Sequence, residues 1–107
     1  MKVLMIENRK VTLTDIPNST PDEELHAMQA AVGGYIETVT LAEDAVMIVD
    51  EEGLLKALNQ NALASLVARQ QIVGPALLVG VTVNADGEQV FCDCPERYVH
   101  DLLILGQ

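Results

Sequence analysis

The order of apolar and polar residues along the chain predicts strands that pair as hairpins. Some runs are continuously apolar, others alternate with the period of two typical of a half-buried strand, and polar turns separate the members of each pair. The predicted strands are Lys2–Glu7, Val11–Ile16, Tyr35–Leu41, Ala45–Val49, Ala76–Val83 and Gln89–Asp93. Because the two strands of a hairpin run in opposite directions, we expect a mostly antiparallel sheet.

A first helix is predicted over about residues 20–33. Thr20 is a suitable N-cap, Pro21 occupies the first helical position, and Glu23 completes a capping box with Thr20. Gly33 is expected to end the helix, because glycine tolerates the left-handed C′ position best. The buried face is expected to comprise Leu25, Met28 and Val32.

Two shorter helices are predicted further along the chain. Asn59 or Asn61 is expected to cap the second helix, and Pro95 is expected to open the third. Their apolar faces are expected to comprise Leu58, Ala62, Leu63, Leu66 and Val67 in the second helix, and Tyr98, Val99, Leu102 and Leu103 in the third. Together with the hairpins, this order predicts an α+β fold, a mostly antiparallel sheet with two to three helices packed on one side.

Size and composition limit the possible functions. The chain has 107 residues and a mass of 11.6 kDa, which fits a single compact domain over residues 1–107. Half of the residues are apolar but only Tyr35, Phe91 and Tyr98 are aromatic, so the core must be aliphatic. Sixteen acidic and six basic residues give a net charge of −10. Such a chain lacks the cationic surface that phosphate backbones require, which excludes ordinary direct nucleic-acid binding.

The sequence predicts a cytoplasmic protein without a membrane partner. The apolar opening Val3–Ile6 is too short for a signal-peptide core. The longest apolar run, Ile72–Val83, contains glycine and proline and is shorter than the about 20 residues that span a bilayer. Cys92 and Cys94 are too few and too close for a disulfide framework, so we expect reduced thiols.

Two groups of candidate metal ligands do not match known metal sites. Asp50-Glu51-Glu52 lacks the alternating ligand spacing of a calcium loop, which favours a solvated turn. Cys92, Cys94 and His100, with His26 as a fourth candidate, do not have the spacing of a structural zinc site. We therefore expect no metal and no cofactor.

Cys94 is the one candidate nucleophile. It precedes a predicted helix N-terminus, a position that lowers the pKa of a thiol. His100 lies near the other end of that helix, so the two side chains are not expected to meet. We assign no catalytic residue, and an enzyme that uses Cys94 or acidic residues is the weakest of the functional hypotheses.

A small-molecule site is conceivable where a helix end, a turn and the start of a second helix converge. Gly33-Gly34 follows a helix instead of preceding one, so a phosphate-binding loop is not expected there. The candidate ligand-binding residues are Gly33, Gly34, Tyr35, Glu37, Glu51, Glu52 and Asn59. A protein with such a pocket would sequester a small molecule.

Several short segments carry a resemblance to a known family. Val32–Glu37 reads VGGYIE, Asp50–Leu55 reads DEEGLL, and Ile72-Val73-Gly74 leads into a strand that closes at Val79-Gly80. Over most of residues 1–80 the chain resembles a small domain-of-unknown-function family of bacteriophages, conjugative elements and their bacterial hosts. The family pattern has asparagine and lysine where this chain has Asp50 and Leu54, which weakens the expectation of an anionic ligand.

The resemblance implies an accessory protein of a mobile element. Our main hypothesis is a non-enzymatic binding or interaction module that modulates a host protein, and the alternative is a small-molecule-sequestering protein. A protein partner or a homo-oligomer is expected. Self-association could use the backbone of a hairpin edge such as the first strand.

Overall fold

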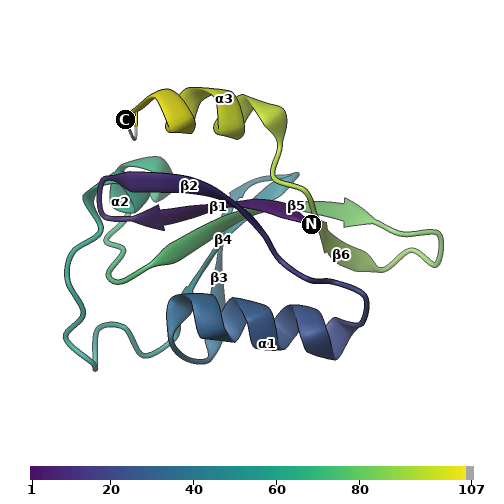
Figure 1. The fold of residues 1–107 in the computed structure, drawn as a ribbon, viewed down its shortest axis with the longest axis horizontal. Helices are drawn as coiled ribbons and strands as arrows, with labels where there is room; N and C mark the ends of the chain where they lie inside the picture. The colour runs from purple at the N-terminus through teal and green to yellow at the C-terminus, as the bar shows by residue number, and fades with distance from the viewer. Residues whose placement is uncertain (106–107) are drawn as a thin grey trace.

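The computed structural model describes residues 1–105 and consists of a central antiparallel sheet with helices on both faces (Figure 1). The strands are β1 (Lys2–Glu7), β2 (Lys10–Asp15), β3 (Ile36–Ala42), β4 (Ala45–Asp50), β5 (Ala76–Val83) and β6 (Gln89–Cys92). The helices are α1 (Pro21–Val32), α2 (Ala62–Ala68) and α3 (Glu96–Leu105). The six strands are ordered β2-β1-β5-β4-β3, and β6 pairs with the last four residues of β5.

The predicted fold class is confirmed, but the prediction that all helices pack on one side of the sheet is wrong. α1 lies on one face, whereas α2 and α3 lie on the other (Figure 1). The reason is the composition of the central strands, because Ala76–Gly80 of β5 is buried at every position. A strand that is apolar on both sides needs a cover on both sides.

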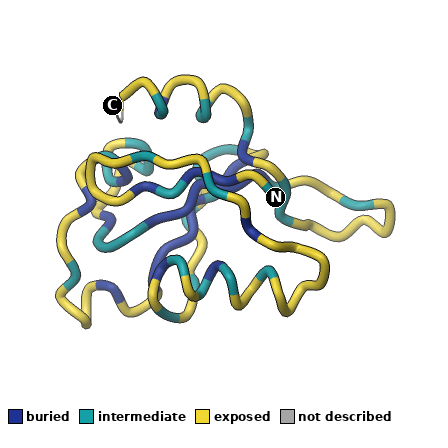
Figure 2. Tube along the Cα trace, in the orientation of Figure 1, coloured by how far each residue is buried: buried dark blue, intermediate teal, exposed yellow. Residues whose placement is uncertain are grey.

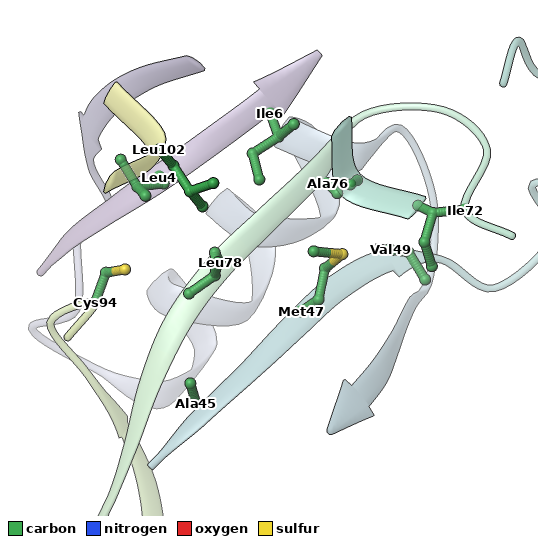
Figure 3. Close-up of a cluster of buried hydrophobic side chains, with 11 residues drawn as sticks. Leu4, Ile6, Ala45, Met47, Val49, Ile72, Ala76, Leu78, Cys94 and Leu102 are labelled. Carbon is green, nitrogen blue, oxygen red and sulfur yellow. The ribbon is translucent and has the colours of Figure 1, made fainter. Parts of the chain in front are cut away.

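Side chains of successive residues in each central strand therefore point to opposite faces of the sheet and pack into two separate cores. The core under α1 consists of Val3, Ile16, Met28, Val32, Ile48, Leu77 and Val79. The core under α2 and α3 includes Leu4, Ile6, Met47, Val49, Ile72, Ala76, Leu78 and Leu102 (Figure 3). Both cores are aliphatic, as the composition predicts, and the exposed residues lie in the loops, on the outer sides of α1 and α3 and along β2 (Figure 2).

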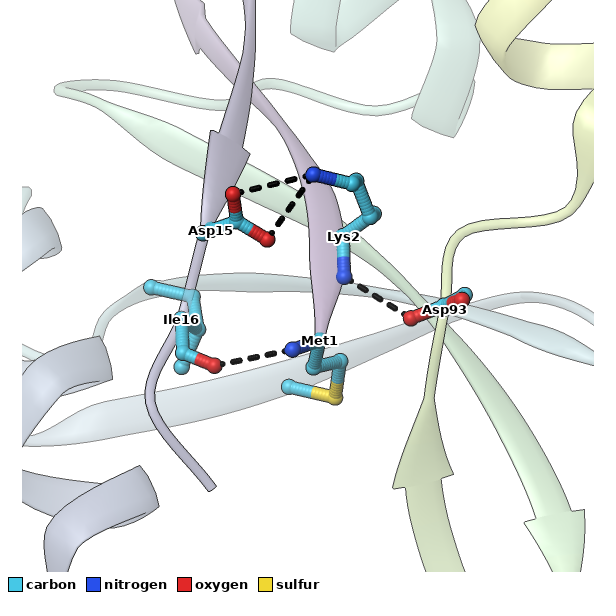
Figure 4. Close-up of polar contacts among 5 residues, drawn as sticks. All are labelled: Met1, Lys2, Asp15, Ile16 and Asp93. Atoms are coloured by element: carbon cyan, nitrogen blue, oxygen red, sulfur yellow. Dashed lines mark hydrogen bonds and ion pairs between the residues drawn. The ribbon is translucent and has the colours of Figure 1, made fainter. Parts of the chain in front are cut away.

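The first strand is not a sheet edge. β1 pairs with β2 on one side and with β5 on the other, so the expectation that the first strand offers free backbone groups for self-association is wrong. The start of β1 is also joined to neighbouring segments (Figure 4). The Met1 ammonium donates to the Ile16 carbonyl at 3.1 Å, the Lys2 N–H donates to Asp93 Oδ1 at 2.8 Å, and the Lys2 ammonium pairs with Asp15. The edge strands of the sheet are β2, β3 and β6, each of which pairs with one other described strand.

The first helix begins and ends as predicted. The Glu23 N–H donates to Thr20 Oγ1 at 3.1 Å, and Gly33 adopts a left-handed conformation with φ +89°. Met28 and Val32 are buried, but Leu25 is exposed, because the alanines Ala27 and Ala31 complete the face toward the sheet instead. Which side of α1 faces the sheet thus depends partly on alanines. A pattern based on hydrophobicity gives alanine little weight.

The second helix is shorter than its apolar pattern suggests. Asn61 is the N-cap, so Leu58 lies outside the helix and Leu66 points into solvent. The residue at its fully buried position is Ala64. The third helix follows Pro95 as predicted, with Leu102 buried and Tyr98, Val99 and Leu103 packed beside it. Within residues 1–105, no helix is long and apolar enough to cross a membrane.

Candidate functional site

The C-terminal end of α1, the start of β3 and the loop after β4 meet, and they carry most of the predicted ligand-binding residues. The Glu51 N–H donates to the Tyr35 carbonyl at 2.8 Å, and the Glu52 N–H donates to Asp50 Oδ1 at 2.8 Å. Lys56 in the same loop reaches the Gly33 carbonyl at 3.1 Å. The structure therefore brings Gly33, Gly34, Tyr35, Glu51 and Glu52 into one region.

The other two predicted residues make none of these hydrogen bonds. Glu37 lies on β3, where it lines a pocket of about 230 Å³ together with Glu51. Asn59 does not line that pocket, and its carbonyl accepts the Gly74 N–H at 2.8 Å. Small-molecule sites usually enclose about 300–1,000 Å³. The pocket beside the predicted residues is smaller than this range.

An ion pair between a buried aspartate and a partly exposed lysine holds this region together. The Asp50 side chain is only 1% exposed, and its Oδ2 lies 2.7 Å from the Lys56 ammonium. The interpretation of Asp50-Glu51-Glu52 as a wholly solvated turn is therefore wrong at Asp50, while Glu51 and Glu52 are exposed. The Lys56 ammonium also lies at the carboxyl end of α1, where the helix dipole favours a cation.

Gly34 is required by this ion pair. A Cβ atom on Gly34 would lie 2.7 Å from the Lys56 Nζ and 2.9 Å from Asp50 Oδ1. The two adjacent glycines thus serve different needs. Gly33 supplies a left-handed turn, and Gly34 leaves room for the carboxylate and the ammonium.

We expect the Asp50→Asn variant to be less stable than wild type by about 1–3 kcal/mol at pH 7, because a buried charged hydrogen bond is weakened. The hydrogen bond from Lys56 lowers the pKa of Asp50 from 3.8. A lowered folded-state pKa stabilises the fold above the unfolded-state pKa, and this contribution is lost as the pH falls through the folded-state pKa. The difference between the two proteins in urea unfolding should therefore shrink below about pH 4.

A suitable control for this experiment is Glu88→Gln, which neutralises an exposed carboxylate on the turn between β5 and β6. We expect its unfolding free energy to stay within about 0.5 kcal/mol of wild type at pH 7. A difference between Asp50→Asn and wild type that stayed constant from pH 7 to pH 2.5 would contradict the role of the Asp50 charge.

The two cysteines are not activated. Burial raises the pKa of the Cys94 thiol to about 12, and burial also raises the pKa of Cys92. The expectation that the helix N-terminus lowers the pKa of Cys94 is wrong, because the thiol is packed in the core under α2 and α3 (Figure 3). His100 is exposed and pairs with Asp101. Among residues 1–105, no group of three or more histidine, cysteine or acidic side chains is arranged to hold a metal ion.

A larger groove lies on the α1 face at the opposite end of the sheet. It has a volume of about 960 Å³. Its floor comes from four neighbouring strands, and the first turn of α1 with the segment before it forms one wall. The lining residues are Asn18, Pro21, Glu24, Thr38, Thr40, Ala42, Glu43, Val46, Val81, Gln89, Val90 and Phe91. None of them belongs to the predicted ligand-binding set.

The floor of the groove combines apolar side chains with Thr38, Thr40 and Gln89, and its margin is acidic. Val46 and Phe91 are half-buried and pack against the core under α1, and Val81 is half-buried as well. Glu24 and Glu43 are the charged lining residues. Partial burial against the groove wall raises the pKa of Glu24. The groove therefore combines accessible apolar surface with two carboxylates and no lining cation.

Residues 1–103 match the model of a family described as a domain of unknown function, DUF3846. The chain belongs to the DUF3846 family. No curated protein and no solved structure matches it. The predicted resemblance to a domain-of-unknown-function family is thus confirmed, and the match extends beyond residue 80 to include α3 as far as Leu103.

Two features of this DUF3846 domain were not predicted from its sequence. The Asp50–Lys56 pair spans six positions across an irregular loop, and no helical or strand period places those side chains together. The adjacent glycines were a usable signal, because one glycine is enough to cap a helix and the second indicates a close approach. The groove has no local signal, since its lining comes from five separate segments.

Proposed function

We propose that this DUF3846 domain is a non-enzymatic interaction module of a bacteriophage or other mobile element, which binds and modulates a host protein in the cytoplasm. The observation that carries the proposal is the groove of about 960 Å³, whose accessible floor is partly apolar. Small-molecule sites typically bury most of the ligand surface, whereas this groove is open on one side and suits a protein segment. Contiguous accessible apolar surface of this kind is typical of interaction sites.

Two further features support the mobile-element setting and the protein partner. The VGGYIE and DEEGLL segments resemble the pattern of a family found in phages and their hosts. The edge strand β3 runs along the groove and pairs only with β4 among the described strands, so its outer backbone groups are available to a partner. The free thiols of Cys92 and Cys94 suit a reducing compartment.

Native mass spectrometry of the protein purified from cells that carry its gene tests this proposal. We expect a complex whose mass exceeds 11.6 kDa by the mass of a second protein and which falls apart on denaturation. An added mass below about 1 kDa would instead support a sequestering protein, because drug-sized ligands fill pockets of about 300–1,000 Å³. A mass of 11.6 kDa under native conditions, together with no complex on chemical cross-linking in those cells, would overturn the proposal.

A further inference from the structure

We propose that the groove between α1 and the β5–β6 hairpin binds a basic amphipathic helix of the protein partner. This inference rests on the proposed function and adds the site, the conformation and the charge of the bound segment.

The α1 layer covers only part of its face of the sheet. Its buried residues Met28 and Val32 pack over β4 and β5 toward the carboxyl end of the helix. At the first turn of α1, where Pro21 and Glu24 line the groove, the sheet extends past the helix and its surface is open. The uncovered side chains of the floor are Thr38, Thr40, Val46, Val81 and Phe91. A second helix laid beside α1 would complete this layer, since a sheet face is commonly covered by helices.

The backbone of the floor favours a helix over an extended segment. β4 pairs with β3 and β5, and β5 pairs with β6, so the backbone groups in the middle of the floor are already hydrogen-bonded. An extended peptide laid across them would bury its own N–H and C=O groups without partners. A helix satisfies these groups internally and presents only side chains to the floor.

The width of the floor matches a short helix. The floor runs over β3, β4, β5 and β6, which are neighbours at this end of the sheet. Three gaps between adjacent strands correspond to about 14 Å. At 1.5 Å per residue this equals about nine or ten residues of α-helix.

The charge around the groove is acidic. Glu24 and Glu43 line it, and further carboxylates stand on the first turn of α1 and on the β5–β6 turn that adjoin it. These further residues are Asp22, Glu23, Asp86 and Glu88. A partner segment with lysine or arginine on its flanks is complementary to this margin.

The cations of the described chain do not neutralise this end of the sheet. Lys2, Lys56 and Arg97 are already paired with Asp15, Asp50 and Asp44, respectively, and Arg69 ends α2 on the other face of the sheet. Arg9 and Lys10 lie at the β1–β2 turn, next to the start of β5, because Ile6 pairs with Ala76. The eight residues of β5 separate that end from the groove by about 20 Å, well beyond the screening length of about 8 Å at physiological salt. The negative potential at the groove therefore persists.

A synthetic peptide of about 14 residues tests the inference, since it leaves about ten residues for contact after the ends fray. Its sequence has leucine at i, i+3, i+4 and i+7 and lysine or arginine on the flanks. We expect its addition to ¹⁵N-labelled protein to shift the amide resonances of Thr40, Val81 and Phe91, and to leave that of Leu55 unchanged. Two control peptides carry glutamate in place of the basic residues, or a central proline that prevents the helix.

Two double variants with the same net charge distinguish binding at the groove from nonspecific attraction between the basic peptide and the acidic protein. Glu24→Gln with Glu43→Gln removes the charge of the groove margin, and Glu51→Gln with Glu52→Gln removes the same charge at the distant loop. We expect the first pair to weaken peptide binding about tenfold and the second to change it less than about twofold. Val81→Asn, at the floor, should also weaken binding, whereas Thr82→Asn, on the opposite face of β5, should not.

Each other outcome overturns the inference. Equal loss in the two charge pairs means nonspecific attraction, and equal binding of the glutamate peptide means that charge is not recognised. Undiminished binding of the proline peptide means an extended segment at the β3 edge, and resonance shifts confined to other residues mean a different site. No binding of the basic peptide also overturns the inference. A protein complex in native mass spectrometry would still support the proposed function in each of these cases, so the two proposals fail separately.

Discussion

The Asn61→Ala variant is expected to lose about 3–5 kcal/mol of unfolding free energy. The Asn61 side chain is fully buried at the start of α2. Its Nδ2 donates to the carbonyls of Ile6 and Gly74, both at 2.9 Å, and its Oδ1 accepts the Ala64 N–H at 3.2 Å. One amide thus joins β1, α2 and the segment before β5.

The expected loss follows from the groups that alanine would leave unpaired. Loss of the N-cap costs about 1 kcal/mol, and each buried carbonyl without its donor costs about 1–3 kcal/mol. Asn61→Asp is informative because aspartate keeps the capping acceptor but places a carboxylate against the carbonyls of Ile6 and Gly74. We expect it to be at least as destabilising as alanine.

Urea unfolding followed by circular dichroism measures both variants. Asn59→Ala is the matched control, since Asn59 is exposed and uses its backbone carbonyl in the contact with Gly74. We expect the control to lie within about 0.5 kcal/mol of wild type. Similar stability losses in Asn61→Ala and Asn59→Ala would contradict the assigned role of the Asn61 amide.

Local sequence signals were sufficient for the strands and for the first helix. The Asn8, Glu43-Asp44 and Asn84–Gly87 turns and the capping box at Thr20 each depend on residues within a few positions of one another. Strand β5 was predicted with its observed bounds, because a long, largely apolar run flanked by Pro75 and Asn84 has few alternatives. These elements require no knowledge of the tertiary structure.

The placement of the helices depended on information that the local pattern lacks. The continuous apolar run of β5 is typical of a strand covered on both faces, and this is what the structure has. The hairpin connections instead favoured an antiparallel sheet with one solvated face, which led to the wrong placement of the helices. In α2 the position of the N-cap set the helix phase, so Ala64 is buried and Leu66 is exposed. A pattern weighted by side-chain size assigns these two residues the other way round.

The candidate site was predicted least well for a similar reason. Most of the predicted ligand-binding residues do lie together, because the end of α1 and the loop after β4 meet across the β3–β4 ladder. They surround the Asp50–Lys56 ion pair and a pocket of about 230 Å³. The groove is assembled from strand ends that are far apart in the sequence, so only the order of strands in the sheet reveals it.

The Gly80→Ala variant is expected to lose about 3 kcal/mol or more of unfolding free energy. A Cβ atom on Gly80 would collide with the Asp93 carbonyl oxygen and lie 2.8 Å from the Cys92 Sγ. The Asp93 carbonyl is backbone, and that segment is fixed to β1, because the Lys2 N–H donates to Asp93 Oδ1 and the Cys94 N–H donates to the Lys2 carbonyl (Figure 4). The chain therefore cannot move aside without breaking these contacts.

A second readout distinguishes this local cause from a general loss of stability. The segment around Asp93 packs against Gly80, and the next residue, Cys94, is buried in the core. Displacement of this segment should therefore expose the Cys94 thiol. We expect iodoacetamide to alkylate Cys94 faster in Gly80→Ala than in wild type under native conditions. Gly87→Ala serves as the control, since a Cβ there meets open space and its φ of +80° costs about 1–2 kcal/mol without displacing any neighbour. Wild-type stability and alkylation in Gly80→Ala would show that the Asp93 segment does not need the space at Gly80.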